Sequence, residues 1–227
     1  MTEAEWLTDK QLDRLLGHVH NSVSPRKLRL FACACCRRLW PIVDSWCHLL
    51  CALAERHAEG EATAAEVSQV AQEAGDPDWT AALAFEEAAS FGDMLEAASN
   101  AAGNAAFAWA DDVARDDRRG SQFESVRARE QERQCHLLRD VVGNPFRRVA
   151  IEQPWLDWRE QTVVKLAQVA YEERAHPSGE LDPGRLTIVA DALEEAGCTR
   201  DDLLGHLRGP GPHLRGCWAV DLLLEKD

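Results

Sequence analysis

Apolar residues recur along most of the chain at the three- and four-residue spacing that places them on one face of an α-helix. In residues 25–40 this stripe comprises Leu28, Phe31, Ala32, Cys35 and Leu39. We find neither the strict apolar and polar alternation of a half-buried strand nor an Asn-Gly hairpin turn. The pattern predicts an all-α protein, a multi-helix bundle of about nine or ten helices packed as antiparallel hairpins.

Capping residues and helix breakers mark where these helices begin and end. Ser24, Asp76 and Asp182 each precede a proline, which is typical of an N-cap followed by the first helical position. Further predicted caps are Thr8, Thr63 with Glu66, and Thr199 with Asp202. The expected helices are 8–20, 24–40, 42–59, one from 63, 76–115, 121–142, one after 160, 182–197, 199–207 and 213–224.

Two stretches depart from this regular punctuation. The alanine-rich tract within 76–115 is one long helix or two, with Gly92 and Gly103 as the candidate interruptions. Residues 143–160 hold two prolines and no clean helical period, so they predict an irregular connector. We expect a single helical domain over 1–227, with possible sub-domains 1–142 and 161–227 joined by that connector.

Charge and targeting signals limit the compartment and the partners. The net charge of −14 repels nucleic acid and anionic membrane surfaces, so neither is an expected partner. No stretch approaches the roughly 20 apolar residues that span a bilayer. The N-terminal sequence MTEAEWLTDK lacks the basic and apolar regions of a signal peptide. The eight cysteines are therefore expected to be reduced thiols in a cytoplasmic protein.

The helix predicted at 25–40 carries the first candidate for chemistry. Arg26, Arg29, Cys33 and Arg37 fall on one face of this helix. A thiol between guanidinium groups favours its thiolate, the form that reacts with oxidants, attacks electrophiles and binds metals. The arginines of 26–38 also offer an interaction surface for a polyanion. The alternative is that the cysteines pack in the core while the arginines pair with acidic side chains.

Two groups of cysteine and histidine residues are candidate zinc ligands. The first comprises Cys33, Cys36, Cys47 and Cys51, which would meet if two successive helices formed a tight hairpin. The second comprises Cys198, His206, His213 and Cys217 in the C-terminal tail. There His213 precedes Cys217 by four residues and would share its helix face. Imidazole and thiolate are the ligands that zinc prefers, but ordinary packing of these side chains is the competing interpretation.

Catalytic signatures are missing from the sequence. It contains no Gly-x-Ser-x-Gly elbow, His-Glu-x-x-His zinc motif, dinucleotide-binding fingerprint or kinase motif set. We therefore predict no catalytic or cofactor-binding residues and expect a non-catalytic helical protein-interaction module, an adaptor or regulatory subunit with a protein partner. The alternatives are a zinc- or thiol-dependent sensor and a nucleic-acid-binding regulator that uses the arginine-rich helix 26–38.

Several blocks of the chain resemble an uncharacterised family of planctomycete paralogues. These blocks are MTEAEWL, RKLRLFACACCRR, LLRDVVGNPFR, IVADALEEAGC and PGPHLRGCWAVDLLL. They cover both ends and most of the second half, whereas about 42–120 carries fewer of them. The resemblance implies no catalytic residues, because the family has no established activity. It does imply that the helix at 25–40 and the tail at 197–224 belong to one shared scaffold.

Overall fold

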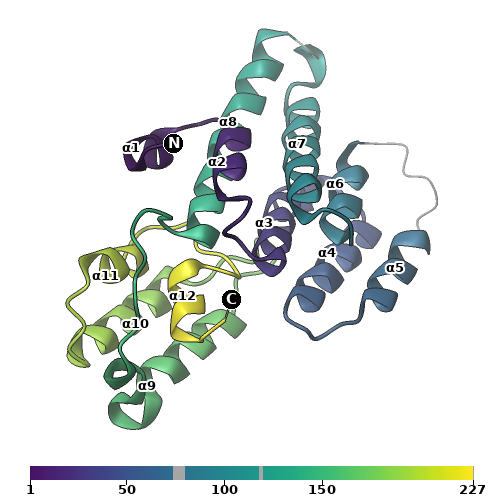
Figure 1. Ribbon diagram of the computed structural model, residues 1–227. Coiled ribbons are helices and arrows are strands. Elements are labelled where there is room, and N and C mark those ends of the chain that lie inside the picture. The colour runs from purple at the N-terminus through teal and green to yellow at the C-terminus, as the bar shows by residue number, and fades with distance from the viewer. Residues whose placement is uncertain (74–79, 118–119, 227) are drawn as a thin grey trace. The chain divides into compact units, whose positions relative to one another are not determined.

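The protein is mainly helical in the part of the chain that the computed structural model describes, residues 1–73, 80–117 and 120–226. The α-helices are α1 (Glu3–Thr8), α2 (Leu12–Val19), α3 (Pro25–Arg37), α4 (Ser45–Ala58), α5 (Ala64–Glu73), α6 (Thr80–Ala89), α7 (Met94–Val113), α8 (Ser121–Val142), α9 (Gln153–Glu172), α10 (Pro183–Glu195), α11 (Asp201–Leu207) and α12 (Trp218–Leu223) (Figure 1). Two 3₁₀ helices lie at Trp40–Ile42 and Arg115–Asp117. The β-structure within these ranges is one isolated antiparallel bridge between Glu180 and Leu214. The prediction of an all-α bundle is confirmed.

The chain divides into two compact units, Met1–Leu138 and Arg139–Asp227. The division falls inside α8, so the connector expected at 143–160 belongs to the second unit. None of the described helices has both the length and the apolar character needed to cross a membrane.

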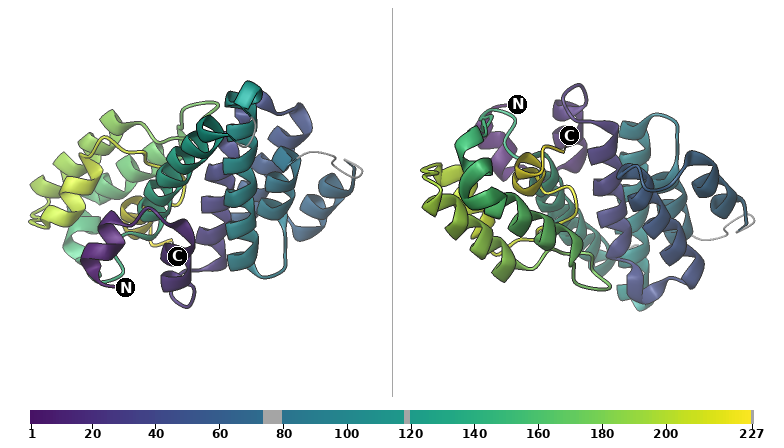
Figure 2. Two further views of the ribbon diagram at one scale, coloured as in Figure 1. Left: turned by 90° about the horizontal axis from the view of Figure 1, so that it is seen from above. Right: turned by 90° about the horizontal axis from the view of Figure 1, so that it is seen from below.

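The N-terminal unit is organised around α3. This helix packs against α4, α6 and α7, and the four helices lie side by side in Figure 2. The contact between α6 and α7 is extensive because alanines line both helices and small side chains let helix backbones approach closely. Helix α5 packs on α4 and α6, and α2 packs on α7. Phe31 and Leu30 of α3 are fully buried in this core.

The C-terminal unit has its own hydrophobic core. Helix α9 packs against α10 and α12, and α10 packs against α11 (Figure 1). Trp155, Val163, Leu186 and Leu193 are among the buried side chains of this core. The segment 208–217, which joins α11 to α12, has no helix of its own. It is held in place where the Leu181 N–H donates to the His213 carbonyl oxygen at 2.8 Å.

Three of the predicted helix caps are confirmed and two are wrong. The confirmed caps are Ser24, Thr63 with Glu66, and Asp182. Thr8 ends α1 instead of starting a helix, and its hydroxyl donates to the Ala4 carbonyl oxygen at 2.8 Å. Helix α11 begins after Arg200 with no side-chain cap, so Thr199 does not act there. The cap predicted at Asp76 lies outside the described residues.

Some helix boundaries also differ from the prediction. The alanine-rich tract is two helices separated near Gly92, while Gly103 lies inside α7. Helix α9 starts at Gln153, within the expected connector, and non-helical backbone angles interrupt it from Trp158 to Gln161. The last helix starts at Trp218, so the five residues before it are not helical, contrary to the expected helix 213–224.

Candidate metal centre

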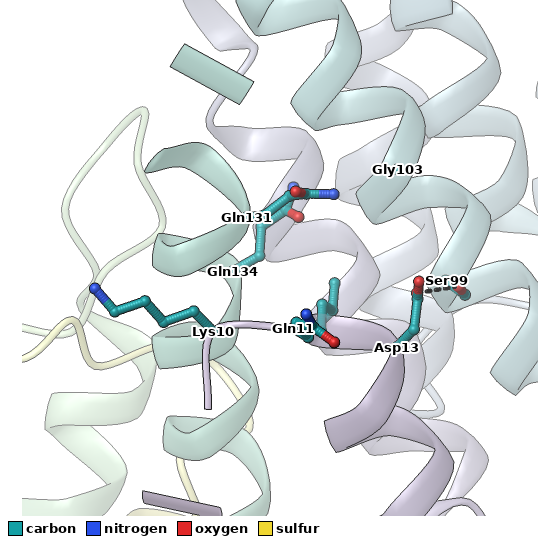
Figure 3. A pocket seen from close by; sticks show the side chains of 8 residues that line it. Lys10, Gln11, Asp13, Ser99, Gly103, Gln131 and Gln134 are labelled. Atoms are coloured by element: carbon teal, nitrogen blue, oxygen red, sulfur yellow. Dashed lines mark hydrogen bonds between the residues drawn. The ribbon is translucent and has the colours of Figure 1, made fainter. Parts of the chain in front are cut away.

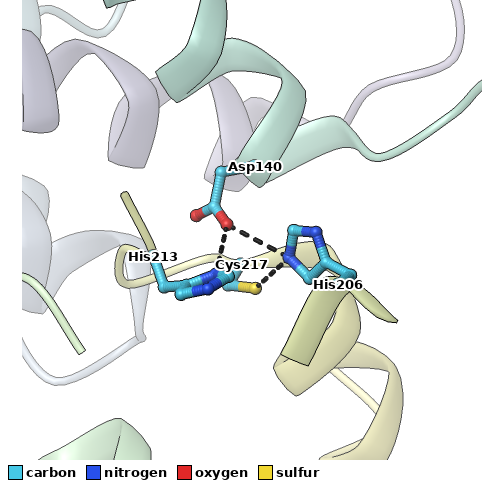
Figure 4. Close-up of side chains that lie close together, drawn as sticks. All are labelled: Asp140, His206, His213 and Cys217. Carbon is cyan, nitrogen blue, oxygen red and sulfur yellow. Dashed lines mark hydrogen bonds and ion pairs between the residues drawn. The ribbon is translucent and has the colours of Figure 1, made fainter. Parts of the chain in front are cut away.

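Four side chains of the C-terminal unit converge on one point (Figure 4). Asp140 comes from the last turn of α8 and His206 from α11, while His213 and Cys217 come from the segment that follows α11. One ligand atom of each residue lies within 4.8 Å of the other three. Within the described ranges, these four residues are the set of histidine, cysteine and acidic side chains that lie close enough together to hold a metal ion.

The separations between the four ligand atoms approach those of a tetrahedral metal centre. His213 Nδ1 lies 3.1 Å and His206 Nε2 lies 3.2 Å from the same oxygen of Asp140, Oδ1. His206 Nε2 is also 3.1 Å from Cys217 Sγ. Tetrahedral zinc with bonds of about 2.0–2.3 Å would set such atoms about 3.3–3.6 Å apart. Around a zinc ion these three contacts would widen by a few tenths of an ångström, whereas a pair near the 4.8 Å limit of the group would close by about 1 Å.

Hydrogen bonds from outside the group orient two of the ligands. Asp140 Oδ2 accepts a hydrogen bond from the Leu214 N–H at 2.8 Å, which leaves Oδ1 facing the imidazoles. His213 Nε2 donates to the Gly209 carbonyl oxygen at 3.1 Å, so Nδ1 is the nitrogen aimed at the centre. Metal-binding histidines characteristically donate their other ring N–H in this way, which fixes the ring and raises its basicity.

Glycines allow the chain between His206 and His213 to fold back. Gly211 has a φ of +84°, and a Cβ there would lie 2.9 Å from the His213 backbone nitrogen. At Gly209 a Cβ would lie 3.0 Å from the His206 carbonyl oxygen. The Gly-Pro-Gly-Pro sequence is therefore a turn that brings the two histidine rings together, with centroids 4.9 Å apart.

Burial and mutual contact set the charges of the group. Asp140 and His213 are each 3 % exposed and Cys217 is fully buried. Burial alone would raise the pKa of Asp140, but hydrogen bonds from His206 and His213 outweigh it and lower this pKa. For His213 burial would lower the pKa, yet the hydrogen bond and the charge of Asp140 raise it. Burial and the Asp140 charge raise the pKa of the Cys217 thiol well above its usual range.

These shifts define what a metal ion would have to displace. Without metal, these directions favour an ionised Asp140, a protonated His213 and a neutral Cys217 thiol. A divalent ion would release protons from His213 and Cys217 on binding. The two anionic ligands, carboxylate and thiolate, would then neutralise the ion, which suits a buried site because an unbalanced buried charge is costly.

Three of the four tail residues predicted as zinc ligands meet here. They are His206, His213 and Cys217, whereas Cys198 lies in the hydrophobic core of the unit and is not part of the group. Asp140 was not predicted. The one sequence feature that could have indicated it is its position in the apolar stretch LLRDVV at the end of a helix. Its neighbours Leu138 and Val141 are fully buried, so the acidic side chain lies among core residues.

The other predicted zinc group, Cys33, Cys36, Cys47 and Cys51, does not form a ligand cluster. All four thiols are buried. The sulfurs of Cys33 and Cys51 each lie near the other residue's carbonyl oxygen, at 4.0 Å and 3.7 Å, and Cys36 Sγ donates to the Ala84 carbonyl oxygen at 3.2 Å. These cysteines pack as small core residues between helices.

Three of the four residues predicted as an interaction surface, Arg29, Cys33 and Arg37, are buried, and Arg26 is only partly exposed. Arg29 is 6 % exposed and donates to the carbonyl oxygens of Ala88 and Ser90, at 3.0 Å and 2.7 Å. Arg37 is 7 % exposed and pairs with Glu55, while Arg26 pairs with Glu59 at 2.9 Å. These guanidinium groups are occupied inside the N-terminal unit, which leaves little positive surface on this helix for nucleic acid.

A cavity of about 200 Å³ lies in the N-terminal unit between the start of α2, α7 and α8 (Figure 3). Its lining is mainly polar: Lys10, Gln11, Leu12, Asp13, Ser99, Gly103, Gln131 and Gln134. Lys10 pairs with Glu132 at 2.7 Å, and the Ser99 hydroxyl lies 3.5 Å from Asp13 Oδ1. Its lining holds no cysteine or histidine, so it offers neither a thiol nucleophile nor an imidazole base.

The fold and the four side chains thus define an all-α protein with a buried Asp/His/His/Cys group. Comparisons with protein-family models, with curated proteins and with solved structures found no match.

Proposed function

We propose that this protein binds one zinc ion through Asp140, His206, His213 and Cys217. The observation that carries the proposal is the convergence of these four ligand atoms within 4.8 Å of one another in a largely buried part of the C-terminal unit. Two imidazoles, a thiol and a carboxylate drawn from three parts of the sequence do not meet by local chain geometry. Their convergence supports a metal ion bound by all four side chains.

The donor set favours zinc over other common metal ions. Magnesium and calcium take six or more oxygen ligands, and this group offers a single carboxylate among softer donors. Zinc accepts four ligands in a tetrahedron and takes nitrogen, sulfur and oxygen together. One oxygen of Asp140 is already bonded to the Leu214 N–H, so the carboxylate supplies one oxygen and the ligand count stays at four.

The number of protein ligands favours a non-catalytic role for the zinc. Catalytic zinc keeps a position open for water or substrate, whereas four protein ligands close the coordination sphere. The ion would join the end of α8 to the non-helical segment 208–217, and its binding energy would add to the stability of the unit. This proposal develops the zinc-dependent alternative of the sequence analysis, and it assigns no catalytic residues. An adaptor or regulatory role with a protein partner stays a prediction, to be tested by affinity capture.

The test is the metal content of the full chain purified without chelator, measured by inductively coupled plasma mass spectrometry. We expect close to one zinc per chain, and the loss of that zinc in the variants His213→Gln and Cys217→Ser. Cys198→Ser is the matched control, because Cys198 is a buried thiol of the same unit outside the group, and this variant should keep its zinc. A wild-type chain that binds no zinc even after incubation with the ion would refute the proposal.

A further inference from the structure

The four ligands of the proposed zinc site are not equally enclosed. The side chains of Asp140 and His213 are 3 % and 2 % exposed, and Cys217 is fully buried. The side chain of His206 is 22 % exposed, so this ligand alone reaches the surface. The His206 ring is therefore the most solvent-accessible part of the group.

The ligands also differ in how firmly the protein holds them. Asp140 is held through Oδ2 by the Leu214 N–H, and His213 is held through Nε2 by the Gly209 carbonyl. Cys217 is fully buried at the start of α12, so its side chain is held by packing. His206 faces the centre with Nε2, and among the described residues its Nδ1 has no hydrogen-bond partner. The His206 ring also lies edge-on to His213 and tilted against Trp218, each at a centroid distance of 4.9 Å, and these contacts hold the ring less firmly than a hydrogen bond would.

We infer that zinc enters and leaves the site through displacement of His206, which makes the bound ion exchangeable with zinc chelators in solution. This inference rests on the proposed zinc binding and adds how occupancy is regulated. The Zn–Nε2 bond breaks and the ring turns toward solvent. A water molecule or a donor atom of an incoming chelator then forms the replacing bond, while Asp140, His213 and Cys217 still hold the ion. No electron is transferred, and the metal stays divalent.

The hydrogen bonds that hold Asp140 and His213 from outside the group indicate how much more weakly His206 should be held. Loss of such an outer contact typically weakens metal binding about 10–100-fold. His206 lacks this contact within the described structure, so its bond to the metal should be the first to open. Zinc would then exchange with the free ion in solution without unfolding of the C-terminal unit, as a zinc sensor requires. A permanently bound structural ion would not respond in this way.

The experiment follows the transfer of zinc from the loaded full chain to a colorimetric chelator by stopped-flow absorbance. We expect the release rate to rise with chelator concentration, because the chelator takes the position that His206 vacates. His206→Ala should raise the release rate by at least about tenfold, the smallest typical effect of losing even an outer contact, because the variant lacks the ligand whose displacement opens the site. It should still bind one zinc at saturating metal. His213→Ala should lose the zinc altogether. His176→Ala, which removes an exposed histidine of the same unit, is the matched control and should behave as wild type.

Each outcome separates this inference from the proposed function. A release rate that is independent of chelator and equal in wild type and His206→Ala would mean that the unit must unfold first. Zinc binding would then stand and the inference would fall. The inference also falls if His206→Ala loses its zinc as completely as His213→Ala while remaining folded by circular dichroism. If the alanine variant does not fold, His206→Gln replaces it under the same criteria. A wild-type chain without zinc refutes both proposals.

Discussion

Replacing Asp140 with asparagine should remove the zinc-dependent stability of the C-terminal unit. Asparagine has the same shape, and its carbonyl oxygen can still accept from the Leu214 N–H, which Asp140 Oδ2 accepts at 2.8 Å. What changes is the atom that faces the two imidazoles, which becomes a neutral NH₂ group. This group neither binds a metal ion nor balances the charge of His213.

The expected loss has one part without metal and one part with it. In the metal-free protein the substitution removes the hydrogen bonds to Asp140 Oδ1 from His213 and His206, at 3.1 Å and 3.2 Å. Hydrogen bonds to charged groups contribute about 1.5–3 kcal/mol each, so we expect a loss of about 3 kcal/mol or more. Zinc at about 100 times its dissociation constant would stabilise the wild-type unit by a further 2.7 kcal/mol or so.

Thermal unfolding of the full chain with zinc or with chelator measures both parts. For a unit the size of Arg139–Asp227, one kcal/mol shifts the midpoint by about 4–8 °C. Zinc should therefore raise the wild-type midpoint of this unit by about 10–20 °C and should leave that of Asp140→Asn almost unchanged.

The matched control is Asp191→Asn, in which an exposed acid of the same unit loses its ion pair with Arg208. Surface pairs of this kind contribute at most about 1 kcal/mol, so this variant should keep the full zinc response. The reasoning is refuted if Asp140→Asn gains as much from zinc as the wild type does, since the carboxylate would then not be a ligand.

Three further outcomes are expected. Gly211→Ala should weaken zinc binding at least about tenfold in calorimetric titration. A φ of +84° costs a non-glycine residue about 1–2 kcal/mol, and the added Cβ would press on the His213 backbone. An affinity equal to that of the wild type would contradict this prediction. Glu55→Gln should lower the free energy of unfolding of the N-terminal unit, measured in urea, by about 3–5 kcal/mol, because it removes the negative charge that pairs with the buried Arg37. A decrease below about 1 kcal/mol would argue against a buried ion pair. Native alkylation at pH 8 should modify few of the eight thiols, because all eight are buried and burial raises the pKa of several of them, that of Cys47 to about 12. Rapid labelling of a core cysteine would favour the thiol-sensor alternative.

Local sequence signals determined the helices and part of the candidate site. Helical periodicity predicted the all-α fold, and the helix 121–142 has the bounds that its pattern gave, with Gly143 after it at a φ of +75°. The tail was recognised as a zinc candidate because histidine and cysteine are zinc ligands wherever they lie. Periodicity and residue chemistry are properties of short segments, so they can be read without knowledge of the packing.

The tertiary structure alone decided which side chains meet. His213 and Cys217 were expected on one helix face, but the segment that carries them is not helical, and packing brings them to His206 and Asp140 instead. The arginines of α3 were expected at the surface, yet Arg29 and Arg37 turn inward because partners on other helices accept their hydrogen bonds. A contact between residues far apart in the chain depends on the packing of whole helices. Local patterns do not contain that information, and so Asp140 became a ligand candidate only in the folded chain.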